Sequence, residues 1–579
     1  VSEIVGSLQN VNDTLMKLYR RIITITGTSP DPYRDYSIAE SIPDMVEILE
    51  EARRILRTEK KNLETVTGNK SVNTSTIQTL LSQVENVIET PDSLITSARL
   101  NSFSSNISSL SSWLLDLKYQ PLTIDYFILK APDDTLPRCN AGFIENFISG
   151  FKNFIASFVQ QYGISGNSGN KKITIWLSLG RDQLQIINNI VSDSFTPQYK
   201  IDVDIKLVDA SLIQAILAKN GPDVAIMVAR DQPVNLAVRN GLTDLSKLEG
   251  FDEVKSRFID SATVPYEILG GCYGLPDSLS YNMLFYRRDI LEKLEIPVPE
   301  TWDEFLAAIA VLQRNNMQSW IPYTQITTTA TVNTGVGGLN LFASILQQFG
   351  GSFYNAEKTA TELESPTALN AFTYWTDMYT KYKLPTTASF YNRFRLGTMP
   401  LGIEVYTLYT TLKEAAPEID GRWGIALVPG TQSNGSVNHT VSGAGTGCGI
   451  ISSSKNKEAA WEFLKWWTSS DTQLRYNNNV ESILGAVSRT TTATLEAFKE
   501  MSWEKKDLQI LLKQRENISE IPEVAGSYYV SRAVDQAFWA VINGEEAPKD
   551  SLVEWADIAD NEIERKINQY SNKKHQNGD

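Results

Sequence analysis

The sequence predicts a two-lobed α/β protein that is preceded by an all-α helical bundle. Residues 1–120 place apolar side chains every three or four positions, which is the spacing of amphipathic helices. From residue 171 onward, helical stretches alternate with short stretches typical of strands, which are either apolar throughout or alternate between apolar and polar residues. Near the middle, residues 270–305 leave one strand–helix unit and begin another, which indicates a passage between two lobes.

The amino-terminal region contains four apolar stripes joined by short polar turns. The first stripe consists of Ile4, Leu8, Val11, Leu15, Leu18 and Ile22, and the others follow residues 45–66, 77–87 and 100–117. Such stripes predict an antiparallel bundle over residues 1–120. The stripes either only bury one another or also form a docking surface for a partner or for the cell envelope.

Residues 121–170 are expected to connect this bundle to the lobes. Residues 121–129 have the composition of a strand, and residues 143–162 form a helix with an aromatic face. That face is expected to pack on the bundle or on a lobe, because the basic polar side typical of a membrane-surface helix is missing. Residues 163–170, GISGNSGN, have the composition of a flexible linker.

The alternation that follows residue 171 predicts a parallel sheet. Expected strands cover residues 173–177, 201–208 and 224–228, with helical stretches between them. Ligands of such sheets bind beyond the carboxyl ends of the strands. The loops at these ends either are only turns and helix caps or also contact the ligand. The candidate contacts are Trp176, Ser178, Asp182, Arg230 and Asp231.

Residues 270–305 read GGCYGLPDSLSYNMLFYRRDILEKLEIPVPETWDEF. They predict a turn, a short extended crossing, an apolar strand and two helices. Thr301 and Glu304 have the spacing of a capping box, and Pro297 and Pro299 hold the segment before it extended. The candidate ligand contacts of the crossing and its strand are Asp277, Ser280 and Asn282.

The order YGLP, crossing, YRRDIL and P-x-TWDEF resembles that of the extracellular solute-binding proteins of bacterial ABC importers. The resemblance favours the carbohydrate group that includes maltose-binding protein, and it extends from about residue 172 to about residue 570, with a GPD turn at residues 221–223. It implies the periplasmic-binding-protein-like type II fold, with ligand held between the lobes and without a reaction. The bundle departs from this pattern, because the family usually has only a short leader.

The predicted domains are residues 1–120 (bundle), 121–170 (connection), 171–280 with 436–486 (first lobe), 281–435 with 487–570 (second lobe) and 571–579 (disordered tail). The resemblance implies three crossings between the lobes. The candidate crossings are residues 278–282, 430–438 and 482–488, where glycine and serine permit changes of backbone torsion.

Residues 315–356 and 424–454 contain no Asp, Glu, Lys or Arg, yet they are rich in hydroxyl and amide side chains. Such groups bind neutral polyols without the cost of burying a charge. We therefore expect a cleft for a neutral, hydroxyl-rich ligand, to which Asn333, Gly443 and Thr446 contribute. Ordinary Thr- and Gly-rich loops are the alternative.

The resemblance adds candidate residues in two further segments. Residues 390–409 are similar to the family's strand before a ligand loop, which implies ligand contacts for Glu404, Tyr406 and Tyr409. Tyr528, Tyr529 and Arg532 fall at the start of a helix that contacts ligand in the family. We expect Trp176, Tyr406 and Tyr529 to stack on sugar rings, although such tyrosines can also be packing residues. The segment KEAAWEFLKWW is expected to bury Trp461, Leu464 and Trp467.

Composition narrows the function further. The net charge of −15 argues against nucleic acid as a partner, and no apolar run is long enough to span a bilayer. Three scattered cysteines, Cys139, Cys272 and Cys448, form neither a disulfide framework nor a zinc site. Histidine-based catalysis would depend on His439 in a loop, since His575 lies in the polar tail. We expect neither a metal nor a cofactor.

The predicted function is capture of a carbohydrate, a neutral oligosaccharide, for the permease subunits of an ABC importer. The chain is expected to act as a monomeric lipoprotein at the extracellular face of the cell membrane, peripheral to it through an amino-terminal anchor absent from this chain. Two rival functions remain. A glycosidase or lyase would need two carboxylates beside the cleft, and a surface-adhesion protein would use the bundle.

Overall fold

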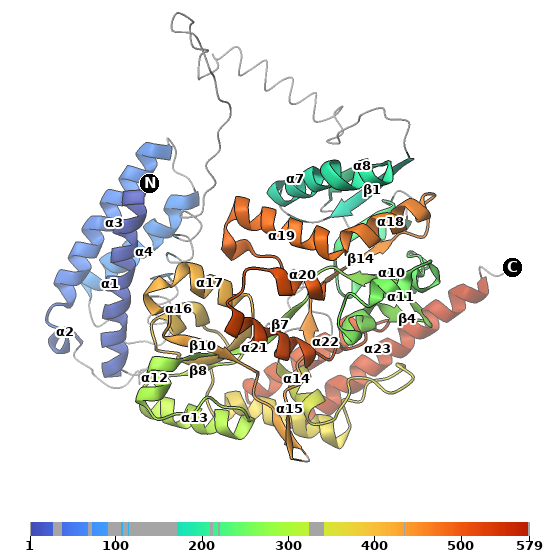
Figure 1. Cartoon of the computed structure of the whole chain (residues 1–579). Helices are drawn as coiled ribbons and strands as arrows, with labels where there is room; N and C mark the ends of the chain where they lie inside the picture. Colours follow the sequence, from blue (N-terminus) through green and yellow to red (C-terminus); the bar gives the residue numbers. More distant parts are fainter. Residues whose placement is uncertain are drawn as a thin grey trace, which may run out of the picture.

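The computed structural model describes residues 2–26, 38–67, 72–90, 103, 106, 107, 110, 114, 171–177, 179, 181–208, 212–217, 221–323, 341–433 and 435–576 (Figure 1). Within these residues, an all-α bundle accompanies two α/β lobes that each contain their own sheet. This architecture confirms the predicted fold class. The strand, aromatic helix and linker expected over residues 121–170 lie outside the described residues.

The bundle is formed by the apolar stripes that the sequence shows. Its helices are α1 (Ser2–Thr26), α2 (Ile38–Ser41), α3 (Met45–Thr67) and α4 (Val72–Glu89). Leu8, Leu15 and Ile22 of α1 are completely buried, as the four- and three-residue spacing requires. The fourth stripe contributes to the same core, which includes Phe103, Ile107, Leu110 and Leu114.

The first lobe is built on a five-stranded sheet with the order β2-β1-β3-β14-β6. β1, β2 and β3 run parallel, so their carboxyl ends lie at one edge, and β14 pairs with β3 and β6 in the antiparallel sense. The strands are β1 (Lys171–Leu177), β2 (Ile201–Leu207), β3 (Val224–Ala229), β6 (Leu275–Pro276) and β14 (Thr446–Ile450), with a small hairpin of β4 (Glu267–Ile268) and β5 (Gly271–Cys272).

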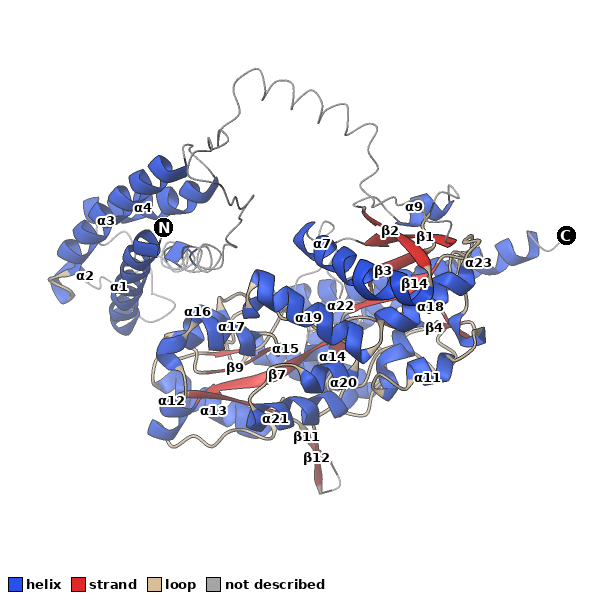
Figure 2. Ribbon diagram, turned by 45° about the horizontal axis from the view of Figure 1, so that its top comes forward, coloured by secondary structure: helices blue, strands red, loops and turns tan. Residues whose placement is uncertain are grey.

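Helices cover this sheet and complete the first lobe (Figure 2). They are α7 (Arg181–Ile190), the π-helical η2 (Val191–Phe195), α8 (Thr196–Tyr199), α9 (Leu212–Leu217), α10 (Gln232–Ala237), η3 (Leu245–Lys247), α11 (Phe251–Lys255), η4 (Asp260–Tyr266), α18 (Lys457–Trp467), α19 (Ser470–Leu484), η6 (Ala486–Ser488) and α20 (Leu495–Glu500). Trp461, Leu464 and Trp467 of α18 are buried, which confirms the predicted core face of that helix.

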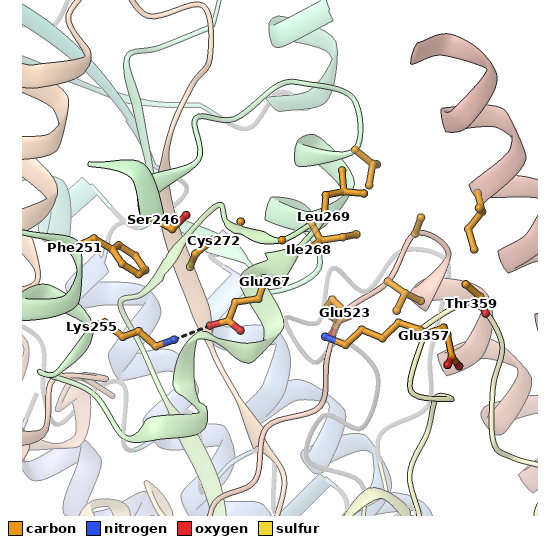
Figure 3. Close-up of a pocket in the computed structure, with 17 residues that line it drawn as sticks. Ser246, Phe251, Lys255, Glu267, Ile268, Leu269, Cys272, Glu357, Thr359 and Glu523 are labelled. Atoms are coloured by element: carbon orange, nitrogen blue, oxygen red, sulfur yellow. Dashed lines mark hydrogen bonds and ion pairs between the residues drawn. The ribbon is translucent and has the colours of Figure 1, made fainter. Parts of the chain in front are cut away.

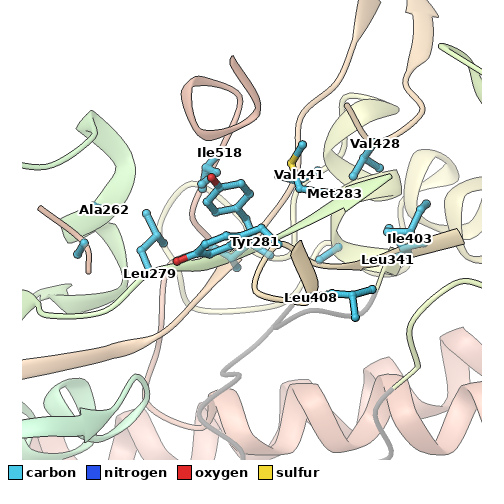
Figure 4. Close-up of a cluster of buried hydrophobic side chains, with 14 of the residues drawn as sticks. Ala262, Leu279, Tyr281, Met283, Leu341, Ile403, Leu408, Val428, Val441 and Ile518 are labelled. Carbon is cyan, nitrogen blue, oxygen red and sulfur yellow. The ribbon is translucent and has the colours of Figure 1, made fainter. Parts of the chain in front are cut away.

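The second lobe contains a sheet with the order β10-β7-β9-β8, and β13 also pairs with β7. Its strands are β7 (Ser280–Arg287), β8 (Ser319–Trp320), β9 (Leu401–Val405), β10 (Trp423–Ala426) and β13 (Gly443–Ala444). The core around β7 includes Tyr281 and Met283, together with Ile403 of β9 and Val441 (Figure 4). These side chains are completely buried.

The helices of the second lobe surround this sheet. They are α12 (Arg288–Lys293), α13 (Trp302–Arg314), α14 (Leu341–Gln348), α15 (Pro366–Thr380), α16 (Phe390–Arg395), α17 (Leu408–Ala415), η5 (Pro417–Ile419), α21 (Lys505–Glu516), α22 (Ser527–Ile542) and α23 (Pro548–Gln576). The predicted capping box begins α13, because the Thr301 side chain accepts from Glu304 N and the Glu304 carboxylate accepts from Thr301 N. α23 continues through residues that were predicted to form part of a disordered tail.

Chain segments that connect the lobes lie side by side at the junction. The segment between β6 and β7 pairs with the segment after η6, through Leu279 N to Thr491 O at 2.6 Å and a bridge between Ser278 and Thr492. The passage from β13 to β14 runs through Gly445, whose absent Cβ would lie 2.1 Å from Ser278 O. Only glycine fits there without a shift of the backbone.

Two of the three predicted crossings were wrong. Residues 430–438 instead contain the hairpin of β11 (Thr431–Ser433) and β12 (Ser436–Asn438), which among the described strands pair only with each other. At residues 482–488, η6 contacts α17 of the second lobe, but the following α20 packs back on α19 of the first lobe, so the chain crosses fully only before α21, which contacts β7 and β10. Glycine and serine occur in hairpin turns as well as in hinges, so their presence did not distinguish the two.

The bundle contacts the second lobe through α1 and α16 (Figure 1). The Arg395 guanidinium lies 3.6 Å from the Asp13 carboxylate and also pairs with Glu418. Leu396, next to α16, packs on the apolar core of the bundle. Among the described helices of the whole chain, none is both long and apolar enough to cross a membrane.

Candidate binding site between the lobes

A cavity of about 710 Å³ lies between the two lobes, a volume within the range typical of small-molecule sites. The first lobe contributes α10, α11 and the β4–β5 hairpin, while the second contributes a turn before α15, the segment before α22, and α23 (Figure 3). The lining residues are Val238, Ser246, Phe251, Lys255, Glu267, Ile268, Leu269, Gly270, Gly271, Cys272, Glu357, Lys358, Thr359, Glu523, Val524, Ala525 and Ile567.

The tip of the β4–β5 hairpin forms one edge of this cavity. Ile268 pairs with Gly271, and the two turn residues, Leu269 and Gly270, have φ angles of 55° and 76°. A two-residue turn with both φ angles positive matches the twist of the strands, but a leucine in the left-handed region is strained. Leu269 is also 59% exposed. An exposed apolar side chain held in this conformation is a candidate contact for a ligand or for the opposite lobe.

Charged side chains line the polar part of the cavity. The Lys255 ammonium donates to the Glu267 carboxylate at 2.9 Å, and the Thr263 hydroxyl donates to the same oxygen at 2.6 Å. Burial favours the protonated form of Glu267, but the bonds from Thr263 and Lys255 outweigh it and lower the pKa of Glu267. Lys358, on the second lobe, also attracts this carboxylate. Glu267 is therefore ionised and faces cations from both lobes.

Arg230 lies at the carboxyl end of β3 and is only 1% exposed. Its Nη1 donates to Gly443 O at 2.6 Å and to the Glu520 carboxylate at 2.5 Å, and its Nη2 donates to Ile521 O at 2.8 Å. The Glu523 carboxylate, part of the cavity wall, lies 3.4 Å from Nε. Burial disfavours the charged guanidinium, but the two glutamates outweigh it and raise the pKa of Arg230.

Asp277 connects β3 with two of the segments that join the lobes. Its carboxylate accepts from Met227 N at 2.7 Å and from the Thr446 hydroxyl at 2.5 Å. Burial raises the pKa of Asp277 to about 6, although these hydrogen bonds act in the opposite direction. In the part of the chain that the structure describes, no three His, Cys, Asp or Glu side chains are grouped as metal ligands would be.

Two family matches cover the bundle and most of the lobes. Residues 3–119 match the bacterial solute-binding protein, 4-helix bundle domain, and residues 182–474 match the bacterial extracellular solute-binding protein family. The chain belongs to this solute-binding family. The resemblance noted in the sequence is therefore confirmed, and the enlarged amino-terminal region is a domain known from other solute-binding proteins.

Individual relatives of this solute-binding protein are distant. A protein of Brucella abortus (strain 2308) is 25% identical over 256 residues, which are 42% of this chain and 57% of that protein. The chain thus spans a little over half the length of this relative. The maltotriose-binding protein of Pyrococcus abyssi (strain GE5 / Orsay) is 24% identical over 318 residues, 52% of this chain and 63% of that protein.

A solved structure shows the same fold. The sugar-binding protein MalE from Xanthomonas citri has a TM-score of 0.57 and 17% identity, covering 69% of this chain and 99% of that chain. At this identity the likeness shows the fold alone. It agrees with the two lobes described above.

The structure brings several of the sequence-predicted residues together near the junction. Arg230 contacts Gly443, Asp277 contacts Thr446, and Ser280 pairs with Ala444 next to Gly443. None of these side chains belongs to the cavity lining. The cavity lining also contains no residue from 315–356 or 424–454, the uncharged stretches expected to form the cleft.

Other candidates lie on the second sheet and in its surroundings. Asn282 is buried on β7 and pairs with Val405, next to Glu404. The Glu404 carboxylate accepts from the Trp320 indole at 3.0 Å, and burial raises the pKa of Glu404. Asp231 begins α10 and is partly buried, with a pKa that burial raises. Trp176 is partly buried within β1 and pairs with Lys206 of β2.

Tyr406 and Tyr409 pack in the interior and do not present a stacking surface. Tyr406 is 1% exposed, and its ring stacks on that of Tyr281 with centroids 4.6 Å apart. Tyr409 is 3% exposed and donates its hydroxyl to Asp507 at 2.9 Å. The expectation that Tyr406 stacks on a sugar is therefore corrected, because neighbouring aromatic rings already cover its faces.

The start of α22 remains available for ligand contact. Tyr528 is 45% exposed, and its ring meets that of Tyr529 edge-on at 5.7 Å. Arg532 is exposed one turn further along the helix. Ser178 and Asn333 lie outside the described residues, and so does the side chain of Asp182.

Sequence reasoning missed the acidic residues that Arg230 binds and those that line the cavity. Glu520 and Glu523 occur in the segment SEIPEV between two helices, where charged residues are ordinary and gave no signal. Glu267 lies in the two-residue strand β4 and Lys358 in a short turn far away in the chain, so neither gave a signal. The motif GG at residues 270–271 was the only available signal, because it indicated a tight turn in front of YGLP.

Proposed function

We propose that this solute-binding protein captures a neutral oligosaccharide between its lobes and delivers it to an ABC-importer permease. The observation that carries this proposal is the cavity of about 710 Å³ whose walls come from both lobes. A ligand bound there contacts both lobes at once, so its affinity depends on their relative position. A permease can distinguish the bound and unbound proteins on that basis.

The carbohydrate class is supported by the relatives and by the composition of the cavity. The relatives include proteins named as a maltotriose-binding protein and a sugar-binding protein. Phe251 supplies an aromatic ring to the cavity, and Ser246 and Thr359 supply hydroxyls. An apolar face with a few polar groups is typical of pockets that bind sugars.

Charge balance supports a neutral ligand. The lining contains Glu267, Glu357 and Glu523 but only two ammonium groups, Lys255 and Lys358. Lys255 is already paired with Glu267. An acidic sugar would therefore place a carboxylate beside an excess of carboxylates, which is unfavourable in a partly desolvated site.

The family also supports the location of the protein. The protein acts outside the cytoplasmic membrane, as members of this extracellular family do. We propose that it binds its ligand without transforming it, that it acts as a monomer, and that an anchor holds it at the cell surface. The bundle then lies between the anchor and the second lobe.

Thermal unfolding with sugars tests the proposal. We expect maltotriose or a longer neutral malto-oligosaccharide to raise Tm, and trigalacturonate to leave it unchanged at the same concentration. Mass analysis of the incubated sugar should show no change. Tight binding of trigalacturonate without binding of neutral sugars would contradict the neutral class, and cleavage products would show an enzyme.

A matched pair of variants locates the ligand. Lys358→Ala removes a lysine that lines the cavity, whereas Lys381→Ala removes a surface lysine of the same lobe with 69% of its side chain exposed. We expect weaker sugar binding in the first variant and wild-type binding in the second. Equal affinity in both variants would exclude the cavity as the site.

A further inference from the structure

The contacts of Arg230 join the two lobes. Arg230 follows β3 of the first lobe, whereas Gly443 belongs to β13, which pairs with β7 of the second lobe. The segment that carries Glu520 is also attached to the second lobe. Val441 exchanges backbone hydrogen bonds with it at Asn517 and Ser519, and the Gln347 amide donates to Ser519 O at 3.0 Å. The groups that accept hydrogen bonds from Arg230 therefore belong to the second lobe or to segments attached to it.

The ion pairs between Arg230 and the two glutamates are buried, which makes them costly to separate. Arg230 and Glu523 are each 1% exposed, and Glu520 is 7% exposed. Burial raises the pKa of Glu520 and so opposes its charge, whereas the Arg230 guanidinium favours that charge. Between the ionised groups the hydrogen bonds are stronger than neutral ones, and losing one partner of the buried pair leaves an uncompensated charge. A relative movement of the lobes that separated Arg230 from Glu520 would carry that cost.

The absence of a side chain at Gly443 allows the Glu520 carboxylate to lie beside the backbone. A Cβ at residue 443 would lie 2.3 Å from the Glu520 carboxylate oxygen. The glycine thus leaves room for the carboxylate directly beside the main chain, and its carbonyl accepts from the same guanidinium. The same residue is one position away from Ala444, where the chain leaves the second sheet.

The cluster of Arg230, Glu520 and Glu523 also borders the cavity. Glu523 contributes both to the cavity wall and to the surroundings of Arg230. Ala229, the residue before Arg230, pairs with Thr446, the first residue of β14 after the β13–β14 passage. The ion pairs of Arg230 thus lie between the β13–β14 passage and the cavity. At that place they oppose rotation of one lobe relative to the other about the junction.

We propose that Arg230, Glu520 and Glu523 form a latch. The attraction between their opposite charges holds the two lobes in the arrangement that this structure shows. This inference rests on the proposed function, since it assigns a regulatory role to the junction beside the proposed sugar site. The latch keeps the cavity narrow. For a ligand that needs wider access, the observed affinity is therefore proportional to the fraction of molecules in which the latch is open. Arg230 is consequently a positioning residue and not a ligand contact.

Distance measurements between spin labels test the latch without any sugar. Labels at Leu269→Cys and Lys358→Cys report across the cavity from the two lobes, in a chain whose three native cysteines are replaced by alanine. Glu520→Gln keeps the shape of the side chain and removes its charge. We expect mainly the short distance in the labelled parent chain, with about one tenth of the molecules at a longer distance, and mainly the longer distance in Glu520→Gln.

Glu481→Gln is the matched control. Glu481 pairs with Arg489 at 2.6 Å in a partly buried ion pair, and α19 and η6 carry both residues in the first lobe. The control should keep the short distance. Gly443→Ala forces Glu520 away by collision and should reproduce the Glu520→Gln result independently.

Binding kinetics give the second readout. For maltotriose, the association rate constant should rise about tenfold in Glu520→Gln if a fraction near one tenth of the parent molecules is open. Unchanged distances in both Glu520→Gln and Gly443→Ala, with the fold intact by circular dichroism, would overturn the latch. A longer distance without any sugar binding would leave the latch standing and contradict the proposed function.

Discussion

Thr446 donates its hydroxyl to the Asp277 carboxylate at 2.5 Å, and the Asp277 amide donates to Thr446 O at 3.1 Å. The two residues belong to different segments that connect the lobes. The carboxylate also accepts from Met227 N in β3, so a single buried side chain holds three parts of the chain together. The geometry of the junction thus depends on the protonation state of Asp277.

Asp277 should make stability depend on pH. Burial raises the pKa of its carboxyl from 3.8 to about 6, so the native state holds a proton more tightly than the unfolded state. The free energy of unfolding should therefore fall as pH rises from about 4 to about 6, by up to about 3 kcal/mol for this group. Asp277→Asn should flatten the profile in that range, as measured by urea unfolding at each pH.

The control for this profile is Asp420→Asn, because Asp420 is a surface carboxyl whose pKa the Lys413 ammonium lowers. Its removal should leave the fall between pH 4 and 6 in place. If Asp277→Asn keeps the full slope of the wild-type protein, the carboxyl of Asp277 does not titrate near pH 6.

Tyr529→Ala and Tyr406→Ala should separate binding from stability. Tyr529 lies at the start of α22, just after the lining residue Ala525, and the sequence predicts that it contacts sugar; for a sugar that extends beyond the cavity lining, its truncation should weaken maltotriose binding by about 1–3 kcal/mol. Tyr406 is buried against Tyr281, so its truncation should lower the free energy of unfolding by about 3–5 kcal/mol. Calorimetric titration and urea unfolding of both variants measure the two effects, and the opposite assignment of losses would refute the prediction.

Gly445→Ala should disturb the junction. The added Cβ would lie 2.1 Å from Ser278 O, a backbone atom that shifts only with the connecting segment. We expect a loss of about 1–3 kcal/mol in the free energy of unfolding, as for other overpacked sites. Gly6→Ala in α1 meets nothing within 4 Å and should be neutral or stabilising. Equal stability of both variants would show that the passage accommodates a side chain.

A fragment that begins at residue 171 should still bind sugar, because no bundle residue lines the cavity among those described. Removal of the bundle uncovers Leu396 and takes the half-exposed Asp13 away from Arg395, which keeps its second partner, Glu418. The fragment should therefore self-associate, and Leu396→Ser within it should reduce that association in analytical ultracentrifugation. Loss of sugar binding by a folded, monomeric fragment would mean that the bundle contributes to the site.

The sequence by itself determined the elements of this protein and their order. Leu8, Leu15 and Ile22 specify a buried helix face because the spacing of 3.6 residues per turn is a local property. The capping box of Thr301 and Glu304 is equally local and could be predicted from four residues. The alternation after residue 171 fixed the fold class for the same reason.

Only the tertiary structure decided which polar residues meet. Arg230 and Glu520 are far apart in the chain, and the composition of SEIPEV shows nothing of the guanidinium that it surrounds. Tyr406 and Tyr529 have the same chemistry, yet one is enclosed by rings from β7 and the segment before α21, while the other lies at a helix start. Burial and ion pairing depend on neighbours brought together by folding, and a single sequence records the side chains but not those neighbours.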